Sequence, residues 1–286
     1  AEAGKLQLEL KDKSIITSTA DIVYVDVFTA PTVNMGEEVE SVRGGDEITL
    51  EGDYLYNVAT ITFMSGVDVA IDSEAVVEVT RHTIRVVVPN NALTGQIKIA
   101  DANGINVYSV NEVVVRQPEI ESITPTTIKA GEKLTIKGKD VDLIESVEFA
   151  GGSTVSDIEV VDAKSIKVTV PATATNGAVK ATSFAGVSTT STDELTLVVP
   201  SDIKVSAARF KAGESVTITG KDLDLVTSLA FSSGVAGDML YDVDTKAITT
   251  TIPATAVDGA ITLTLANATT VDSEALTLVK AAVTGV

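Results

Sequence analysis

The stretch Gly131-Glu-Lys-Leu-Thr-Ile-Lys-Gly138 encloses a short apolar–polar alternation between two glycines, and Phe149 follows eleven residues after the second glycine. Alternation with a period of two predicts a strand with one buried face. Both spacings recur twice, at residues 45–52 with Phe63 and at residues 213–220 with Phe231. The chain is therefore predicted to be a tandem array built on one structural unit.

A second set of landmarks gives the length of this unit. Each copy contains a β-type run that ends in proline (Pro89, Pro171 and Pro253), and a glycine follows each proline by six residues. Applied along the whole chain, this register predicts three complete repeats, at residues 32–117, 118–199 and 200–286.

The alternation continues through each copy. Ile166, Val168 and Val170 alternate with Lys167 and Thr169, for example. No stretch carries the apolar stripe of a helix of three or more turns. About seven short strands in each repeat of roughly 83 residues predict immunoglobulin-like β-sandwiches. The predicted fold class is all-β, with tandem sandwiches arranged as an elongated rod on the order of 100 Å long.

The composition argues against several classes of function. The 286 residues carry a formal net charge of −19 without a cluster of Lys or Arg, so nucleic acid and anionic membrane surfaces are not expected as partners. The absence of Cys removes disulfides, thiolate metal sites and cysteine nucleophiles. No apolar run is long enough to predict a segment that spans a bilayer.

The residues of the second copy resemble the IPT/TIG domain family. The resemblance rests on Pro118-Glu-Ile-Glu-Ser-Ile-Thr-Pro125, on Ala130-Gly131 through Gly138, on Val147 to Phe149 and on Ile166 to Pro171. The other copies keep the core of this pattern and lose the second proline, and copy three has Ala207 in its place. The resemblance implies an immunoglobulin-like fold. Such domains occur in bacterial surface proteins and glycan-binding lipoproteins, starch-acting enzymes, receptor ectodomains and Rel-type transcription factors, so the function stays open.

Residues 1–31 match only the last part of a repeat. The segment Gly4-Lys-Leu-Gln-Leu-Glu-Leu10 matches the strand that begins at Gly177 in copy two, and residues 18–31 match residues 191–200. We therefore expect residues 1–31 to be the C-terminal part of an incomplete IPT/TIG-like repeat. Strands without a partner sheet would expose apolar faces. Two interpretations stay open, a fragment of a longer array or a half-domain completed by strands of a neighbouring chain.

Paired carboxylates follow the second glycine in two of the copies. Asp140 lies two residues from Asp142, and Asp222 lies two residues from Asp224. Each pair could contribute to a Ca²⁺ site, which needs six to eight oxygen ligands. The simpler interpretation is a solvated turn, because Asp is favoured in turns. No other cofactor is expected.

Tyrosines replace these carboxylates in copy one. Tyr54 and Tyr56 could stack on a sugar ring or anchor a partner, with Tyr108 of the same copy as a third contact. The alternative is that the three rings pack within the protein. His82 is the only histidine, so no Ser/His/Asp triad or histidine metal cluster can be assembled and no catalytic residue is expected.

These features favour a non-enzymatic bacterial surface protein that acts as a stalk or scaffold for adhesion or ligand presentation. It would be extracellular and anchored at the outer membrane through a part outside this chain. The expected partners are other domains of the same longer protein, and a polysaccharide or another surface protein. Two alternatives remain, a surface glycan-binding protein and a polymerising or virion-decorating structural protein. The absence of Trp counts against glycan binding.

Overall fold

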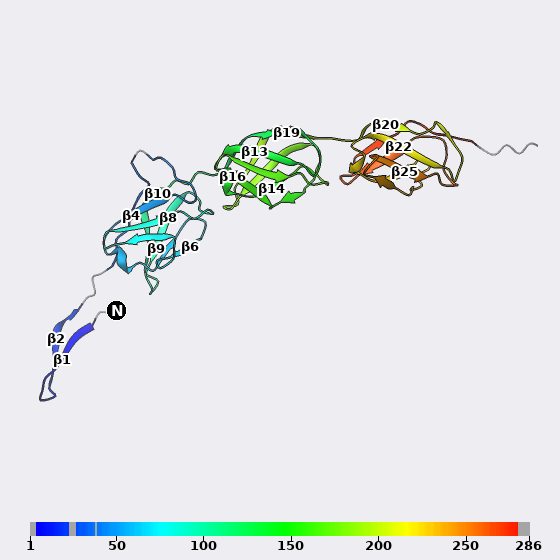
Figure 1. Cartoon of the computed structure of the whole chain (residues 1–286). Coiled ribbons are helices and arrows are strands. Elements are labelled where there is room, and N and C mark those ends of the chain that lie inside the picture. The colour runs from blue at the N-terminus through cyan, green and yellow to red at the C-terminus, as the bar shows by residue number, and fades with distance from the viewer. Residues whose placement is uncertain (1–3, 23–26, 38, 280–286) are drawn as a thin grey trace, which may run out of the picture. The chain divides into compact units, whose positions relative to one another are not determined.

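The computed structural model describes residues 4–22, 27–37 and 39–279, and shows strands joined by loops (Figure 1). The chain divides into two compact units, residues 1–117 with 184–186 and residues 118–183 with 187–286. The helical segments of the described residues are single 3₁₀ turns. The all-β class and the tandem sandwiches predicted from the sequence are confirmed.

The second sandwich, in the second unit, consists of two sheets with strand orders β11-β13-β17-β16 and β12-β19-β18-β14-β15. Every pairing is antiparallel except that of β12 with β19. This is the layout of an immunoglobulin-like sandwich. Its strands are β11 (Glu119–Thr124), β12 (Thr127–Ile128), β13 (Lys133–Lys139), β14 (Ile144–Glu148), β15 (Thr154–Val155), β16 (Ile158–Asp162), β17 (Ser165–Thr169), β18 (Gly177–Ser183) and β19 (Ser188–Leu197).

The third sandwich repeats this layout in the same unit, with strand orders β20-β22-β25-β24, β23-β26-β27 and β21-β28. The pairing of β21 with β28 is again parallel. Its strands are β20 (Ser201–Val205), β21 (Arg209–Phe210), β22 (Ser215–Lys221), β23 (Val226–Phe231), β24 (Leu240–Asp242), β25 (Ala247–Thr251), β26 (Ile261–Leu265), β27 (Thr270–Asp272) and β28 (Thr277–Leu278).

The first unit contains a sandwich with strand orders β3-β4-β8-β7 and β10-β9-β5-β6, together with the hairpin β1-β2. The strands of the sandwich are β3 (Thr32–Asn34), β4 (Glu47–Glu51), β5 (Thr60–Thr62), β6 (Asp68–Ala70), β7 (Val76–Val79), β8 (Thr83–Val87), β9 (Gly95–Ala100) and β10 (Asn106–Val113). The hairpin strands are β1 (Gly4–Glu9) and β2 (Ile15–Ile22).

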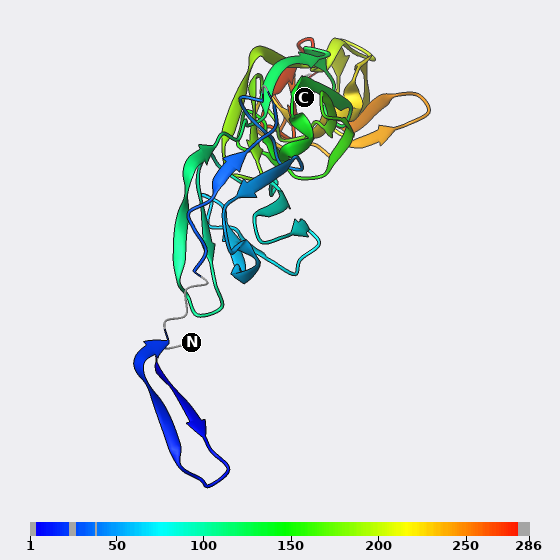
Figure 2. The ribbon, with the colours of Figure 1, turned by 90° about the vertical axis from the view of Figure 1, so that its left-hand side faces the viewer.

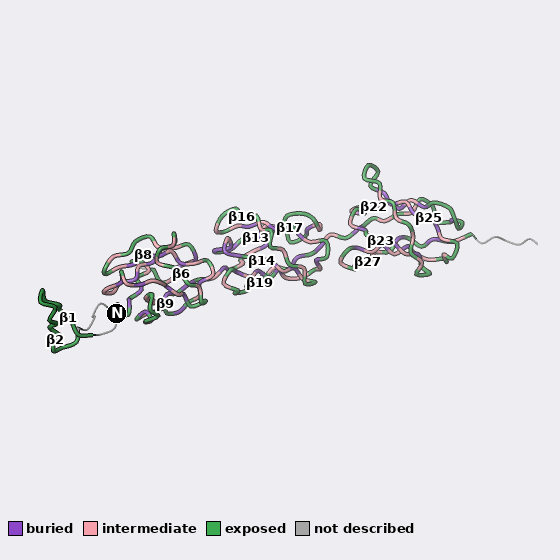
Figure 3. The backbone as a smooth tube through the Cα atoms, turned by 90° about the horizontal axis from the view of Figure 1, so that it is seen from below, coloured by how far each residue is buried: buried purple, intermediate pink, exposed green. Residues whose placement is uncertain are grey.

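Each sandwich has its own largely aliphatic core, and the phenylalanine of the repeated pattern is part of it in every copy. Phe63, Phe149 and Phe231 are all buried, and the burial alternates along the strands as the sequence predicts. In Figure 3 the buried residues lie between the exposed outer faces of the strands. The two glycines of residues 131–138 are required for different reasons. Gly131 has a φ of +91°, whereas Gly138 passes so close to the Glu119 carbonyl that a Cβ would clash.

In the C-terminal part of each repeat a serine hydroxyl binds an N–H of the neighbouring strand, and in the first two sandwiches the strand register shifts there. In the second sandwich the Ser191 hydroxyl accepts the Val179 N–H at 2.9 Å and donates to the Asp193 carbonyl at 2.7 Å. The amides of Ile97 and Ile261 bind equivalent serines in the other two sandwiches, Ser109 at 3.0 Å and Ser273 at 2.9 Å.

The N-terminal hairpin reproduces this geometry without a sandwich of its own. Gly4 pairs with Ile22 as Gly177 pairs with Leu195, and the register shifts at the same place. The Leu6 N–H donates to the Ser18 hydroxyl at 3.0 Å. Figure 2 shows the hairpin as a two-stranded ribbon. Leu6 and Leu8 are each 57% exposed.

The equivalents of these leucines in the second sandwich, Val179 and Ala181, are fully buried. Residues 4–22 therefore have the backbone of the last two strands of a repeat, and two side chains that a core would cover are exposed. The assignment of residues 1–31 to an incomplete repeat stays a prediction, and residues 1–3 and 23–26 of that segment lie outside the described residues.

We predict that Ser191→Ala destabilises the second sandwich by about 1–3 kcal/mol, because the buried Val179 N–H loses its acceptor. Urea unfolding gives the size of the loss, and hydrogen exchange at Val179 assigns it to this sandwich. Thr190→Ala is the control, since Thr190 is exposed on the same strand and should change stability by less than about 0.5 kcal/mol. Equal losses in the two variants would contradict this role of Ser191.

Candidate functional site

The segment that follows the second glycine of each repeat carries the chain from one sheet to the other. We define this inter-sheet loop as residues 52–57, 138–143 and 220–225. Each loop contains a 3₁₀ turn, η1 (Leu55–Asn57), η2 (Val141–Leu143) or η3 (Leu223–Leu225). The residue before each turn is left-handed, with a φ of 59° at Tyr54, 51° at Asp140 and 56° at Asp222. The structure thus places Tyr54 at the backbone position of the two aspartates.

In the first sandwich, arginine and aspartate surround Tyr54. The Arg81 guanidinium lies 4.2 Å from the centre of the Tyr54 ring, which is the geometry of a cation–π contact. Arg81 Nε also lies 2.7 Å from Asp53 Oδ1, and the same carboxylate accepts the Tyr54 N–H at 2.9 Å. The hydrogen bond from Arg81 is the main cause that lowers the pKa of Asp53, and the Arg81 pKa is raised in turn.

The structure brings Tyr54 and Tyr56 together. Their ring centres are 6.2 Å apart, and the planes meet at 67°, so the pair is edge-to-face. Tyr54 packs against the core, whereas Tyr56 is 47% exposed. Tyr108 lies on β10 with 56% exposure and makes no ring contact with either of them within the described residues. Two of the three predicted contact residues therefore form one cluster.

The sequence analysis did not identify Arg81 as part of this cluster. The Arg81 carbonyl accepts a hydrogen bond from the Leu55 N–H of the loop, as the Ala163 carbonyl accepts one from the Val141 N–H. Copy one therefore has Arg81 where copy two has Ala163, and Tyr54 where copy two has Asp140. Both differences can be seen when the sequences of the repeats are aligned. The neighbouring His82 has an exposed side chain, with Nδ1 3.5 Å from Asp53 Oδ1.

In the third sandwich the two predicted carboxylates bind a cation that the chain itself provides. Lys129 Nζ, from the turn before β13, lies 2.8 Å from Asp222 Oδ1 and 2.7 Å from Asp224 Oδ1. The Lys129 side chain is 23% exposed. Burial lowers the pKa of Lys129, but the hydrogen bonds to Asp222 and Asp224 outweigh burial and leave the pKa raised. The sequence analysis missed Lys129, although a basic residue precedes the first glycine by two positions in every copy (Arg43, Lys129 and Lys211).

The corresponding carboxylates of the second sandwich are Asp140, which is buried, and Asp142 in the first turn of η2. Among the described residues, no group of three or more His, Cys, Asp or Glu side chains is placed to hold a metal ion. Calcium binding by Asp140 with Asp142, or by Asp222 with Asp224, stays a prediction. None of the helices in the described part of the chain is long and apolar enough to cross a membrane.

Comparison with known proteins identifies the second repeat, since a family model described as IPT/TIG domain matches residues 118–199. The second sandwich is an IPT/TIG domain. The match covers this repeat alone, and the first and third sandwiches repeat the layout of this IPT/TIG domain. A search of the curated proteins gave no match.

Several solved structures are similar to the chain. One, determined with a xylogluco-oligosaccharide, has 20% identity and a TM-score of 0.33 over 87% of this chain and 60% of that chain. Another is SGBP-B of the Bacteroides ovatus mixed-linkage glucan utilization locus in complex with a heptasaccharide, with 16% identity and a TM-score of 0.26 over 87% and 70%. The surface glycan-binding protein PbSGBP-B from Prevotella bryantii has 20% identity and a TM-score of 0.31 over 58% and 41%. These likenesses concern the fold, and the chain spans less than two thirds of the first and third of these proteins.

We predict that Arg81→Gln raises the pKa of Asp53 towards its ordinary value, because the main cause of the lowered pKa is removed. A carboxylate with a lowered pKa stabilises the fold above its unfolded pKa, and this stabilisation is lost as the pH falls through the folded pKa. The variant should therefore lose less stability on acidification than the parent. Carboxylate NMR titration measures the pKa, and Arg85→Gln, which removes a pair with Glu47, is the control. An unchanged Asp53 pKa in Arg81→Gln would refute the assignment.

Proposed function

We propose that the chain is a non-catalytic scaffold of a bacterial surface protein, in which specific contacts join the second and third sandwiches and the array holds a further domain in place. The observation that carries this proposal is the joint between the second and third sandwiches, which belong to one compact unit. A scaffold needs such joints, because a flexible linker would let each domain move independently.

The joint combines a short connection with contacts from two different loops. Only three residues separate β19 from β20, and the last of them, Pro200, is buried. Lys129 reaches the inter-sheet loop of the third sandwich. The Asn267 side chain, from the turn between β26 and β27, donates to the Ala174 carbonyl at 2.8 Å. Two separate contacts and a three-residue connection together restrict the rotation of one sandwich against the other.

The composition and the comparisons support a surface location. The formal net charge of −19 keeps a β-rich array soluble, and the absence of Cys suits an exterior whose redox conditions change. Proteins similar to the chain in fold are named as surface glycan-binding proteins. We propose that this chain is likewise exposed at a bacterial surface, attached through a part outside it.

We predict that Lys129→Gln widens the range of orientations between the second and third sandwiches, because both carboxylates lose their ammonium partner. The chain has no Cys, so spin labels can be placed at two introduced cysteines, Thr169→Cys and Thr251→Cys, both at exposed sites. Pulsed electron paramagnetic resonance then measures the width of the distance distribution between them. A distribution as narrow as in the parent would contradict the role of Lys129.

Two controls accompany this experiment. Lys139→Gln removes an exposed pair with Glu119 inside the second sandwich and should leave the distribution unchanged. The pH supplies the other control. Because the Lys129 pKa is raised, the stabilisation of the joint by its ion pairs is complete below the usual pKa of a lysine. This stabilisation is lost as the pH rises through the raised pKa, so the distance distribution should broaden there. A parent distribution that is already broad at neutral pH would refute the scaffold proposal.

Capture of polysaccharide is the second candidate, and the Tyr54–Tyr56 cluster is the observation that favours it. Aromatic rings beside an arginine can combine stacking with hydrogen bonds to hydroxyl groups. Two proteins of similar fold were solved with oligosaccharides. Against this, Arg81 lies over the ring of Tyr54 and the two rings are not coplanar, so they offer no flat platform.

If the cluster binds glycan, we predict that Tyr56→Ala lowers the affinity for a binding polysaccharide by about tenfold, since stacking on an exposed ring contributes on the order of 1 kcal/mol. Calorimetric titration with a panel of soluble plant and bacterial glucans measures this effect. Tyr108→Ala is the matched control for an exposed tyrosine outside the cluster. Absence of binding to every glycan in the panel would exclude this candidate.

A further inference from the structure

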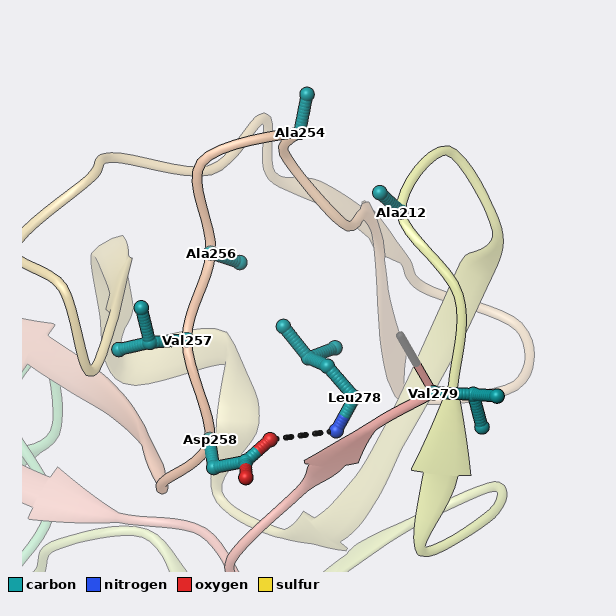
Figure 4. A pocket seen from close by; sticks show the side chains of 7 residues that line it. All are labelled: Ala212, Ala254, Ala256, Val257, Asp258, Leu278 and Val279. Atoms are coloured by element: carbon teal, nitrogen blue, oxygen red, sulfur yellow. Dashed lines mark hydrogen bonds between the residues drawn. The ribbon is translucent and has the colours of Figure 1, made fainter. Parts of the chain in front are cut away.

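The end of the third sandwich that lies beyond β25 and β28 contains an open hollow of about 570 Å³. Figure 4 shows the side chains of Ala256 and Leu278 facing one another across it, with Asp258 hydrogen-bonded to the Leu278 N–H at 2.7 Å. We call this surface the terminal face. Its residues are Ala212, Ala254, Ala256, Val257, Asp258, Leu278 and Val279.

The same surface exists at the end of the second sandwich. Ile128 pairs with Leu197 in the parallel bridge there, as Phe210 pairs with Leu278 in the third sandwich. The Leu197 N–H donates to Asn176 Oδ1 at 2.8 Å, so Asn176 takes the place of Asp258. This register matches the terminal face, position by position, with Ala130, Ala172, Ala174, Thr175, Asn176, Leu197 and Val198.

In the second sandwich this surface faces the sandwich that follows. Ala130, Ala172, Leu197 and Val198 line a cavity of about 290 Å³ together with residues of the third sandwich. These residues of the third sandwich are Asp224, Leu225, Thr227, Leu265, Ala266 and Asn267.

Burial differs accordingly between the two surfaces. Ala174 is fully buried and Leu197 is 7% exposed, whereas the equivalent Ala256 and Leu278 are only half-buried. Val279 is 39% exposed. The terminal face thus corresponds in backbone register to the surface that the second sandwich turns to the third, and its central side chains are more exposed.

A basic side chain lies beside the terminal face as Lys129 lies beside the covered one. Lys211 occupies the turn before β22, and its N–H donates to Glu214 Oε2 at 2.8 Å, as the Lys129 N–H donates to Glu132. The turn therefore has the same form in both sandwiches. Within the described residues, the Lys211 ammonium forms no ion pair, in contrast to the two that Lys129 forms.

We propose that the terminal face docks a further β-sandwich whose inter-sheet loop presents an acidic pair to Lys211. The hollow would face the residue that follows the pair, as the end of the second sandwich faces Leu225 across their shared cavity. This inference rests on the proposed scaffold function and adds the place and the chemistry of the contact with the next domain. Two observations favour this occupant. The Lys211 ammonium would complement an acidic pair, and the equivalent surface of the second sandwich faces a sandwich of this kind.

A second copy of the chain is a poor occupant. The inter-sheet loop of its first sandwich presents Tyr54, Tyr56 and Arg81, and a guanidinium near the Lys211 ammonium is repulsive. The acidic pair of its third sandwich is already bound to Lys129. The inter-sheet loops of its first and third sandwiches therefore disfavour this occupant.

The test replaces residues 280–286 by one further sandwich. A second copy of residues 199–279 is fused directly after Val279, which reproduces the connection between the second and third sandwiches. Spin labels at Thr251→Cys in the third sandwich and at the same position of the added copy report the distance distribution. We expect a distribution as narrow as that between the second and third sandwiches, and a broad one after Lys211→Gln. Lys221→Gln is the control, because Lys221 pairs with Asp202 inside one sandwich.

The outcomes separate this inference from the proposed function. A freely moving added sandwich beside a rigid joint between the second and third sandwiches would overturn the docking face alone. Free movement at both joints would overturn the scaffold proposal as well. Light scattering of the unextended chain supplies a further outcome: self-association that Lys211→Gln abolishes would assign the face to a second copy and overturn the proposal.

Discussion

The constraint on which the repeats depend is the passage from one sheet to the other through a single left-handed residue. The chain must reverse its direction within a few residues at the end of the sandwich, and the left-handed position followed by a 3₁₀ turn achieves this. The turn buries Leu55, Val141 or Leu223 in the core. In the third sandwich the side chain at the left-handed position, Asp222, contacts Lys129 of the preceding sandwich.

The backbone of the inter-sheet loop has the same conformation in all three repeats. The repeats can therefore differ in what this loop contacts through two side chains, the one at the left-handed position and the one two residues later. Aspartate suits the left-handed conformation, since its short polar side chain can hydrogen-bond locally. A pair of aspartates there presents negative charge, which the third sandwich directs at Lys129. Tyrosine is less common in this conformation. In the first sandwich the Tyr54 ring packs on the core and under Arg81, and these contacts offset the conformational cost. The same loop is therefore an ionic contact in one repeat and an aromatic cluster in another.

Much of the fold could be predicted from local spacing. Glycines at fixed intervals mark turns, and alternate apolar residues such as Leu134 and Ile136 mark a buried face, because a strand directs successive side chains to opposite sides. The similarity of residues 4–10 to later strands could also be seen, and the hairpin register agrees with it. The partner of Asp222 could not be predicted in this way. Lys129 lies 93 residues away in the sequence, and pairing at that separation depends on how two sandwiches are joined.

The sequence by itself determined the fold class, the repetition of the unit and the two loop positions at which tyrosine replaces aspartate. It could do so because strands and turns depend on residues that are close in the chain. Only the tertiary structure decided what those positions contact. It showed that Arg81 lies over the Tyr54 ring, that the Lys129 ammonium contacts both Asp222 and Asp224, and that Leu197 is buried while the equivalent Leu278 is half-buried. These features depend on the distances between side chains from separate loops, and a one-dimensional pattern contains no such distances.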